Sequence, residues 1–383
     1  MRFFCNLRFG EHLIMEFILL EDCCEILDSL RIPITASNRE RGIYPYYGAN
    51  GIQDYVSDYI FDDDLVLLAE DGGSFGSKTK PIAYRVSGKC WVNNHAHVLK
   101  PKEGMDVDFL CYSLMFYNTE GLVNGATRQK LTQSAMRKMK IPKFHIDVQR
   151  DIVKEIKSVM SIIDIREKQL EKLSLLVKAR FVEMFGDPIR NQKDWEIVSI
   201  GDIITDVRYG TSKPAVKGGK YPYLRMNNLT EDGHLDLNDL KYIDIQKDEI
   251  EKCVVRKGDV LFNRTNSIDL VGKTAVFDLS EDMVIAGYII RVRLNGRILP
   301  EVFSQYMNLE ALKDILRSMA KGAVNQANIN AQELKSIKVY VPDMKLQKQF
   351  VEIKEQVNKS KVVSQHTTSN PYIQNLNFAV KWL

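Results

Sequence analysis

The 383-residue sequence lacks the marks of a secreted or membrane protein. Its six cysteines never occur at a Cys-x-x-Cys spacing and no secretory leader precedes them, which favours a reducing compartment. The partly apolar stretch at residues 9–20 contains Glu11, His12 and Glu16, so it is too short and too charged to span a bilayer. We therefore predict a cytoplasmic protein without a membrane segment.

A large excess of charge of either sign is also missing. Lysine and arginine number 53 and aspartate and glutamate 50, which gives a net charge of +3. This balance excludes a histone-like protein that is basic over its whole surface, so any surface for nucleic acid must be a local patch. With 45% hydrophobic residues, the chain has enough apolar side chains for two or three globular domains.

Motifs of enzymes that use nucleotide cofactors are absent too. No glycine-rich loop follows a strand and opens a helix, and there is no Asn-Pro-Pro-Tyr or Pro-Cys motif, which counts against a methyltransferase. No complete Gly-x-x-x-x-Gly-Lys-Ser/Thr loop is present, which counts against an ATP-driven motor. We expect no cofactor and no catalytic centre in this chain.

An acidic cluster leaves a metal-dependent nuclease as an alternative. Mg²⁺ catalysis needs two or more converging carboxylates, with a lysine near the attacking water. The possible members are acids, lysines and histidines around two expected strands: Asp62, Asp63, Asp64, Glu70, Asp71, Lys78, Lys80, His95 and His97. A second copy of this region carries Arg264-Thr265 in place of Glu70-Asp71, so we expect neither a metal site nor nuclease activity.

What the chain does contain is an internal repeat. Each half has short apolar or alternating runs that predict strands, and a later helix, at residues 106–116 in the first half and 300–316 in the second. We predict a tandem duplication of a mixed α/β (α+β) module with a mostly antiparallel sheet. Matching segments include Asp64-Leu65-Val66-Leu67 with Asp259-Val260-Leu261-Phe262, His97-Val98-Leu99 with Arg291-Val292-Arg293, and Ile141-Pro142 with Val341-Pro342.

Between the modules, residues 145–185 contain no glycine or proline, and their apolar residues fall mostly three or four positions apart. This spacing predicts one long amphipathic helix with a heptad seam, ended by Gly186 and Pro188. A shorter seam with Phe350 and Val357 follows the second module. Because a long helix with one apolar stripe needs a partner, we expect the two helices to form an antiparallel coiled coil that separates the modules.

Loops of the two modules carry side chains suited to DNA. Residues 127–143 contain six lysines and arginines and no acid, interleaved with polar residues, a composition that binds phosphates. The corresponding stretch at 321–328 replaces most of this charge with amides, which can bond adenine edges. For any single residue, a turn-forming or capping role is the alternative. The candidate DNA-binding residues are Tyr47, Asn50, Lys78, Asn93, Asn94, His95, Arg128, Gln129, Lys130, Arg225, Asn227, Asn263, Arg264, Asn266, Lys273, Asn325, Gln326 and Asn328.

Several longer segments occur in a specific order. Residues 41–51 (Arg-Gly-Ile-Tyr-Pro-Tyr-Tyr-Gly-Ala-Asn-Gly) precede 68–72 (Leu-Ala-Glu-Asp-Gly), 125–129 (Gly-Ala-Thr-Arg-Gln) and a Gln149-bearing helix that ends at 179–188. In the second half, 258–261 (Gly-Asp-Val-Leu), Val341-Pro342 and Gln347 repeat the pattern. Over about residues 19–360, this order resembles the specificity subunits of type I restriction-modification enzymes, which carry two target-recognition domains.

The resemblance implies a DNA-binding subunit without catalysis of its own. Each domain would read one half of a split site on double-stranded DNA. The paired helices would set the gap, since a helix of about 60 Å spans half-sites about 34–36 Å apart. Expected partners are methyltransferase (M) subunits, two of them by the resemblance, which hold S-adenosylmethionine, and endonuclease/translocase (R) subunits that cut.

The same resemblance gives expected domain limits. They are an N-terminal extension at 1–18, a first target-recognition domain at 19–144, a first spacer helix at 145–187, a second target-recognition domain at 188–342, a second spacer helix at 343–366 and a tail at 367–383. Met15 is a candidate start, because the residues before it fit no later pattern. The second helix has no counterpart of the Phe181–Asp187 ending, and the tail follows no motif of the family.

A protein-interaction scaffold is the remaining alternative. In that case the long helices would be the active part and the modules would bind proteins rather than DNA. Binding would then depend little on salt or on DNA sequence, whereas a DNA reader loses affinity steeply as salt rises.

Overall fold

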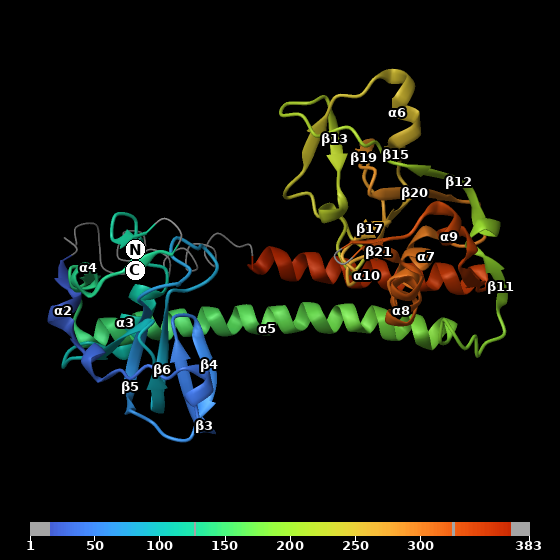
Figure 1. The fold of residues 1–383 in the computed structure, drawn as a ribbon. Coiled ribbons are helices and arrows are strands. Elements are labelled where there is room, and N and C mark those ends of the chain that lie inside the picture. Colours follow the sequence, from blue (N-terminus) through green and yellow to red (C-terminus); the bar gives the residue numbers. More distant parts are fainter. Residues whose placement is uncertain (1–15, 126–127, 324–325, 369–383) are drawn as a thin grey trace. The chain divides into compact units, whose positions relative to one another are not determined.

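The computed structural model describes residues 16–125, 128–323 and 326–368 (Figure 1). The chain divides into two units: unit 1 contains the described residues up to Glu167 and residues 365–368, and unit 2 contains Lys168–Ser364. Most of the expected N-terminal extension and tail, and Asn325, lie outside the described residues. Within the described ranges, no helix is long and apolar enough to cross a membrane.

Unit 1 is built around one six-stranded sheet with the strand order β2-β7-β5-β6-β3-β4. All its neighbouring strands are antiparallel except β3 and β6. The strands are β1 (Phe17–Leu19), β2 (Cys24–Ile26), β3 (Arg41–Gly48), β4 (Gly51–Val56), β5 (Phe61–Ala69), β6 (Ala83–Val92), β7 (Ala96–Pro101), β8 (Val123–Asn124), β9 (Lys130–Leu131) and β10 (Lys140–Pro142), and the helices are α2 (Leu20–Cys23), α3 (Val107–Met115), α4 (Gln133–Arg137) and α5 (Ile146–Phe185), which continues into unit 2.

The central strand β5 explains why this sheet has two covered faces. Residues 65–69 of β5 are all fully buried, so side chains on both sides of the strand pack into apolar clusters. Helix α3 covers one face, because its side chains Phe109 and Leu110 pack with Val66 and Leu68. The helix starts at Asp106, whose carboxylate accepts hydrogen bonds from two backbone N–H groups of the first turn.

Unit 2 contains two four-stranded sheets, with the orders β12-β20-β16-β18 and β14-β13-β19-β15. All pairings within them are antiparallel except that of β13 with β19. The elements are β11 (Glu196–Ser199), β12 (Ile204–Tyr209), β13 (Tyr221–Leu224), β14 (Lys241–Ile243), α6 (Lys247–Cys253), β15 (Val254–Val255), β16 (Val260–Asn263), β17 (Thr265–Asn266), β18 (Thr274–Val276), β19 (Met283–Ile285), β20 (Ile289–Leu294), α7 (Pro300–Met307), α8 (Glu310–Met319), β21 (Lys321–Ala323), β22 (Gln326–Asn328), α9 (Ala331–Ser336), β23 (Lys338–Val341) and α10 (Met344–Thr368).

The helix predicted at 300–316 is in fact two helices, α7 and α8. The chain turns at Asn308, whose side chain is buried and hydrogen bonded to the backbone of Thr274 on β18. Asn308 also donates to the Ser304 carbonyl near the end of α7. The prediction of one continuous helix was therefore wrong, because a tertiary partner stabilises the break.

The predicted duplication is confirmed by matching hydrogen bonds in the two units. β1 pairs with β10 in unit 1 as β11 pairs with β23 in unit 2. The buried amide of Gln149 accepts from the Asp106 N–H and donates to the carbonyls of Gly104 and Phe144. Gln347 likewise accepts from the Leu299 N–H and donates to the carbonyls of Arg297 and Pro342. Each glutamine fastens the first turn of a long helix to its own unit.

The long helices have the seam that the sequence predicts. Along α5, every predicted seam position from Val148 to Phe181 is buried or half-buried. Within unit 2, Phe350 of α10 packs against Phe181 and Phe185 of α5, with ring centroids 5.3 and 5.5 Å apart. A small hollow is lined by Ser174 and Val177 of α5 and by Lys354 and Asn358 of α10, among others. These α10 residues come after Phe350, whereas these α5 residues come before Phe181, so the two helices run in opposite directions. The pairing is therefore antiparallel, as predicted.

Candidate nucleic-acid interface

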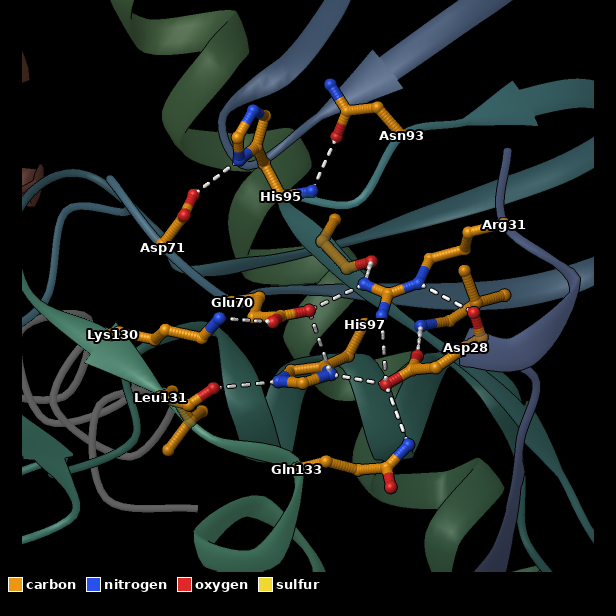
Figure 2. Close-up of polar contacts among 12 residues, drawn as sticks. Asp28, Arg31, Glu70, Asp71, Asn93, His95, His97, Lys130, Leu131 and Gln133 are labelled. Atoms are coloured by element: carbon orange, nitrogen blue, oxygen red, sulfur yellow. Dashed lines mark hydrogen bonds and ion pairs between the residues drawn. The ribbon is translucent and has the colours of Figure 1, made fainter. Parts of the chain in front are cut away.

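Three segments meet at the end of the central strand in unit 1 (Figure 2). Just after β5, the Glu70 N–H donates to the His95 carbonyl at 2.8 Å, and the Glu70 carbonyl accepts from the Leu131 N–H at 2.7 Å. A β-bridge also links Asp71 to Lys130. These bonds hold the β5 end, the turn between β6 and β7, and the basic stretch around β9 next to one another.

An exposed polar group results from this arrangement. Asp71 Oδ1 lies 2.6 Å from His95 Nδ1 and 3.0 Å from Arg128 Nη2. The Arg128 side chain remains 62% exposed, so its other donors are open to a partner. The Asp71 carboxylate thus aligns two of the predicted DNA-binding residues, and Gln129 and Asn94 are exposed beside them in the sequence.

Beneath that group is a charged network that supports it (Figure 2). His97, fully buried, places Nδ1 2.6 Å from Asp28 Oδ2 and Nε2 2.9 Å from the Leu131 carbonyl. Glu70 forms ion pairs with Arg31 at 2.7 Å and Lys130 at 3.0 Å. The network ties the basic stretch to the sheet through side chains as well as backbone.

The pKa values of the two network acids reflect this pairing. Burial by itself raises the pKa of the Asp28 carboxyl, but the hydrogen bond and charge of His97 outweigh it and the pKa is lowered overall. Burial likewise raises the pKa of Glu70, and the hydrogen bonds from Arg31 and Lys130 reverse the shift. Both carboxylates are therefore ionised and engaged by cations of the chain itself.

The acids considered for a nuclease do not converge on one point. Asp63 pairs with Lys100 at 2.8 Å and Asp64 with Arg85 at 2.9 Å, and both lie at the start of β5 while Glu70 follows its end. Among the described residues, the one group of acids and histidine close enough for a metal is Asp28, Glu70 and His97. Arg31, Lys130 and Gln133 already contact those carboxylates, so the geometry gives the nuclease alternative no support.

Other predicted residues of unit 1 divide by exposure. Asn50 is exposed in the β3–β4 turn and donates to the Gly72 carbonyl at 3.0 Å. Lys78 is exposed in the loop between β5 and β6. Tyr47 is half-buried, with its ring 5.7 Å from that of Tyr84. Asn93 is buried, bonded to Gln53 and to the His95 N–H. Asn93 therefore positions the β6–β7 turn and is not part of the exposed surface that could contact DNA.

Unit 2 repeats the strand-end arrangement with different side chains. The Arg264 N–H donates to the Tyr288 carbonyl at 3.0 Å, and the Arg264 carbonyl accepts from the Ile329 N–H at 2.9 Å. These bonds make Arg264 the structural counterpart of Glu70, and Tyr288 that of His95. The same backbone frame thus carries a neutralised acid in unit 1 and an arginine in unit 2.

Several predicted amides of unit 2 form hydrogen bonds inside the unit. Asn263 is fully buried and donates to the carbonyls of Thr265 and Tyr288, and its own Oδ1 accepts from Asn266 at 2.9 Å. Asn328 accepts from the Thr265 hydroxyl at 2.9 Å. Asn263 therefore holds the strand end in shape, whereas Asn266 and Asn328 are half-buried. Asn325 lies outside the described residues, and of Gln326 the structure describes only its place in β22.

A cavity of about 500 Å³ adjoins Arg264 and brings together residues that are distant in sequence. Arg225 and Asn227 line it with Arg264. Lys273 lies outside the lining and is buried, and its ammonium donates to the Met226 carbonyl at 3.0 Å. Burial lowers the pKa of Lys273. Because Met226 lines the cavity, the hydrogen bond from Lys273 supports the cavity wall from inside the unit.

Sequence reasoning missed three residues at this cavity. Tyr288 could have been found, because the repeat register that aligns His97 with Arg291 also aligns Tyr288 with the candidate Asn94. Lys213 lines the cavity and Tyr209 lies under the Arg264 guanidinium, 4.9 Å from ring centroid to Cζ. Neither has a local signal in the sequence, since both come from the β12 region far from Arg264.

Comparisons with known proteins agree with the duplicated architecture. The family model described as "Type I restriction modification DNA specificity domain" matches residues 15–175 and again 192–370. The chain is 27% identical over 347 residues to a putative type I restriction enzyme specificity subunit, S.HindORF215P, of Haemophilus influenzae, covering 88% of this chain and 86% of that protein. It is 23% identical to the EcoKI specificity subunit of Escherichia coli, covering 79% and 69%.

A solved structure has the same fold. The crystal structure of a type I restriction-modification S subunit from M. genitalium superposes with a TM-score of 0.56 at 12% identity, covering 98% of this chain and 97% of that one. The duplicated fold and the two matches of the family model thus define a two-domain DNA specificity protein. The chain belongs to the type I restriction-modification DNA specificity family. Neither the nuclease nor the scaffold alternative finds support in these comparisons.

Proposed function

We propose that this chain reads a DNA target in two parts, one with each unit, and brings methyltransferase and endonuclease subunits to it. The observation that carries this proposal is the repeated strand-end frame, in which equivalent backbone bonds present different polar side chains. A common frame with different side chains suits two half-sites of unlike sequence. Exposed cations such as Arg128 would contact phosphates, and neighbouring amides would contact base edges.

The chain would act without catalysis of its own, in the cytoplasm. Methyl transfer would belong to partner subunits that hold S-adenosylmethionine, two of them by family resemblance, and cleavage to separate endonuclease/translocase subunits. The proposed domain limits are those expected from sequence, with target recognition at 19–144 and 188–342 and spacer helices at 145–187 and 343–366. As one helix of 40 residues, α5 would serve as the spacer between the two readers.

The test is to co-express the chain with its methyltransferase subunit and to sequence the methylated bases in host DNA. We expect one split motif with a fixed gap, which disappears when this chain is omitted. The purified complex should also bind duplexes carrying that motif with an affinity that falls steeply with salt. A complex that assembles but shows neither methylation nor salt-dependent DNA binding would contradict the proposal and favour the scaffold.

A further inference from the structure

The cavity beside Arg264 has the composition of an anion site. Three segments of unit 2 form it, at 211–215, 223–227 and 286–288, together with Arg264 itself. Its lining contains three cations, Lys213, Arg225 and Arg264, and no carboxylate. Lys213 is paired with Glu249 and Arg225 with Asp239, whereas Arg264 pairs with no carboxylate in the described part of the chain.

Two of these cations carry a buried donor without an acceptor. The Nε–H groups of Arg225 and Arg264 are both inaccessible to solvent and have no hydrogen-bond partner. Leaving a buried donor unpaired is costly, so such groups are rare and call for an explanation. Arg291 has the same feature in the interior, but Arg225 and Arg264 share one cavity wall. Both residues line this cavity, so an anion entering it would lie close to two positive charges without contacting the enclosed Nε–H groups.

The Arg264 guanidinium is also held in one orientation. Its Cζ lies 4.9 Å from the centroid of the Tyr209 ring, and Nη1 donates to the Gly287 carbonyl at 3.4 Å. Tyr209 is itself fixed, because its hydroxyl accepts from the Ala331 N–H at 2.8 Å. A planar guanidinium fixed in this way can bind an oxyanion without first losing side-chain freedom.

The shape of the site favours the DNA backbone over base edges. Base edges lie on the floor of a groove and are reached by protein groups that protrude, whereas phosphates project from the duplex. Arg264 lies in a hollow and is half-buried, so a projecting group must come to it. Resting on the proposed function, we infer that this cavity binds one backbone phosphate of the DNA, with Arg264 as its main ligand and Arg225 assisting.

Only unit 2 offers this anchor at the strand end. The counterpart of Arg264 in unit 1 is Glu70, whose carboxylate is engaged by Arg31 and Lys130. The two units therefore contact the DNA backbone differently, although the same backbone hydrogen bonds form at both strand ends. Arg264 fixes the register of unit 2 on its half-site and carries no sequence information itself.

The test compares Arg264→Gln and Arg264→Lys in the complex with methyltransferase subunits, using the duplex motif found by methylation sequencing and duplexes with single base-pair changes. Arg264→Gln should lose about 10-fold in affinity at low salt and reduce the salt slope by about 0.9. All duplexes should be affected alike, and the methylated motif should not change. Arg264→Lys should keep the slope, because it keeps the charge, and lie between wild type and Arg264→Gln in affinity.

Arg317→Gln is the matched control, because Arg317 lies on α8 outside the cavity lining and pairs with Glu310 and Asp314. It makes the same change of charge and should stay close to wild type. Relaxed discrimination at one base pair in either Arg264 variant would overturn the inference in favour of base reading, as would wild-type binding by both. If Arg264→Gln does not fold, Arg264→Lys decides: an equal loss of affinity on all duplexes supports the inference, and wild-type affinity overturns it. If wild type itself binds no DNA, the proposed function fails and not this inference alone.

Discussion

Gln149 and Gln347 show how single residues support both long helices. Each side chain is buried and bonds one carbonyl just before its own helix, together with one N–H and one carbonyl of the loop before α3 or α7. Each glutamine thus joins the start of a long helix to a loop of the same unit. The same residue therefore has the same role in both units.

Replacing Gln347 by leucine should therefore cost stability out of proportion to the loss of one side chain. Gln347→Leu leaves the Leu299 N–H and two carbonyls unpaired in a buried place, which we expect to lower the free energy of unfolding by about 1–3 kcal/mol. Chemical denaturation would measure it. Gln349→Leu, two residues further on the same helix but exposed, is the control and should change little. Equal midpoints for the two variants would contradict the role of Gln347.

A buried lysine should make stability depend on pH. Burial, with Arg317 and Lys273 nearby, lowers the pKa of Lys313 from its ordinary 10.5 to about 7. Its amine donates to the Gly272 carbonyl at 2.6 Å. Between these two pKa values the unfolded chain binds more protons at this position than the folded chain, so its contribution to stability rises with pH across that window and is lost below it.

The comparison of wild type with Lys313→Met isolates this contribution, because other titrating groups are common to both. From pH 7 to pH 9, wild type should gain about 1–2 kcal/mol of unfolding free energy relative to the variant. Urea denaturation at both pH values would measure the difference. Parallel pH profiles would show that Lys313 keeps its ordinary pKa in the folded protein.

At the scale of elements, the two long helices are joined within unit 2 by an aromatic cluster. Phe181 and Phe185 of α5 pack edge-on with Phe350 of α10, and the Phe181 ring lies 6.2 Å from that of Tyr306 on α7. All four are essentially inaccessible to solvent. The end of α5 is thereby part of the core of unit 2 as well as half of a helix pair.

Phe181→Ala should open a cavity in this cluster and lower the free energy of unfolding of unit 2 by about 3–5 kcal/mol. The adjacent Val182 is 43% exposed, so Val182→Ala is a control with the same kind of truncation and a small expected effect. Hydrogen exchange should show faster exchange in α10 and α7 of the first variant only. Unchanged exchange there would mean that the cluster does not hold the helices together.

For the whole molecule, the main feature is that equivalent backbone hydrogen bonds in the two units present side chains of different charge. At the equivalent strand ends, Glu70 is neutralised by two cations while Arg264 faces a cavity free of carboxylates. Exposed charge in unit 1 comes instead from Arg128, held by Asp71. A duplicated protein of this kind is expected to read an asymmetric target, since equivalent positions offer unlike contacts.

Among the residues that the structure describes, Arg128 and Arg264 share no hydrogen-bond partner, so their contributions to DNA affinity should be independent. Arg128→Gln should weaken binding by about 10-fold at low salt, as a lost phosphate contact does. The double variant Arg128→Gln with Arg264→Gln should then lose about 100-fold, additive within about 0.5 kcal/mol. Titrations of the four complexes on one duplex would test it. Strong non-additivity would mean that the two residues act on a common step.

Much of this organisation was predictable because it rests on local pattern. The order of apolar runs predicted two copies of one module, and the seam in residues 145–185 predicted the long helix and its partner. Gly186 ends α5 with a φ of +86°, a conformation that glycine adopts without strain. Periodicity and turn residues act within a few positions of the chain, so they can be recognised without knowing what lies across the fold.

The candidate site was predictable only in part. Sequence marked Arg128 and Arg264 by type and loop position, but it gave Asn93 and Asn263 the same standing, although both are buried and bonded inside their units. Whether an asparagine faces solvent or fastens a turn depends on neighbours from other strands. Local composition is the same in both cases.

By itself, the sequence determined the duplication, the two long helices and the place of the polar loops, because each follows from spacing along the chain. Only the tertiary structure decided that Glu70 is neutralised by Arg31, that Tyr209 fixes Arg264, and that a cavity without carboxylates lies beside it. These contacts join residues separated by 39 and 55 positions (70 − 31 and 264 − 209). The free energy of a buried charge depends on which groups surround it in space, which no short window of sequence specifies.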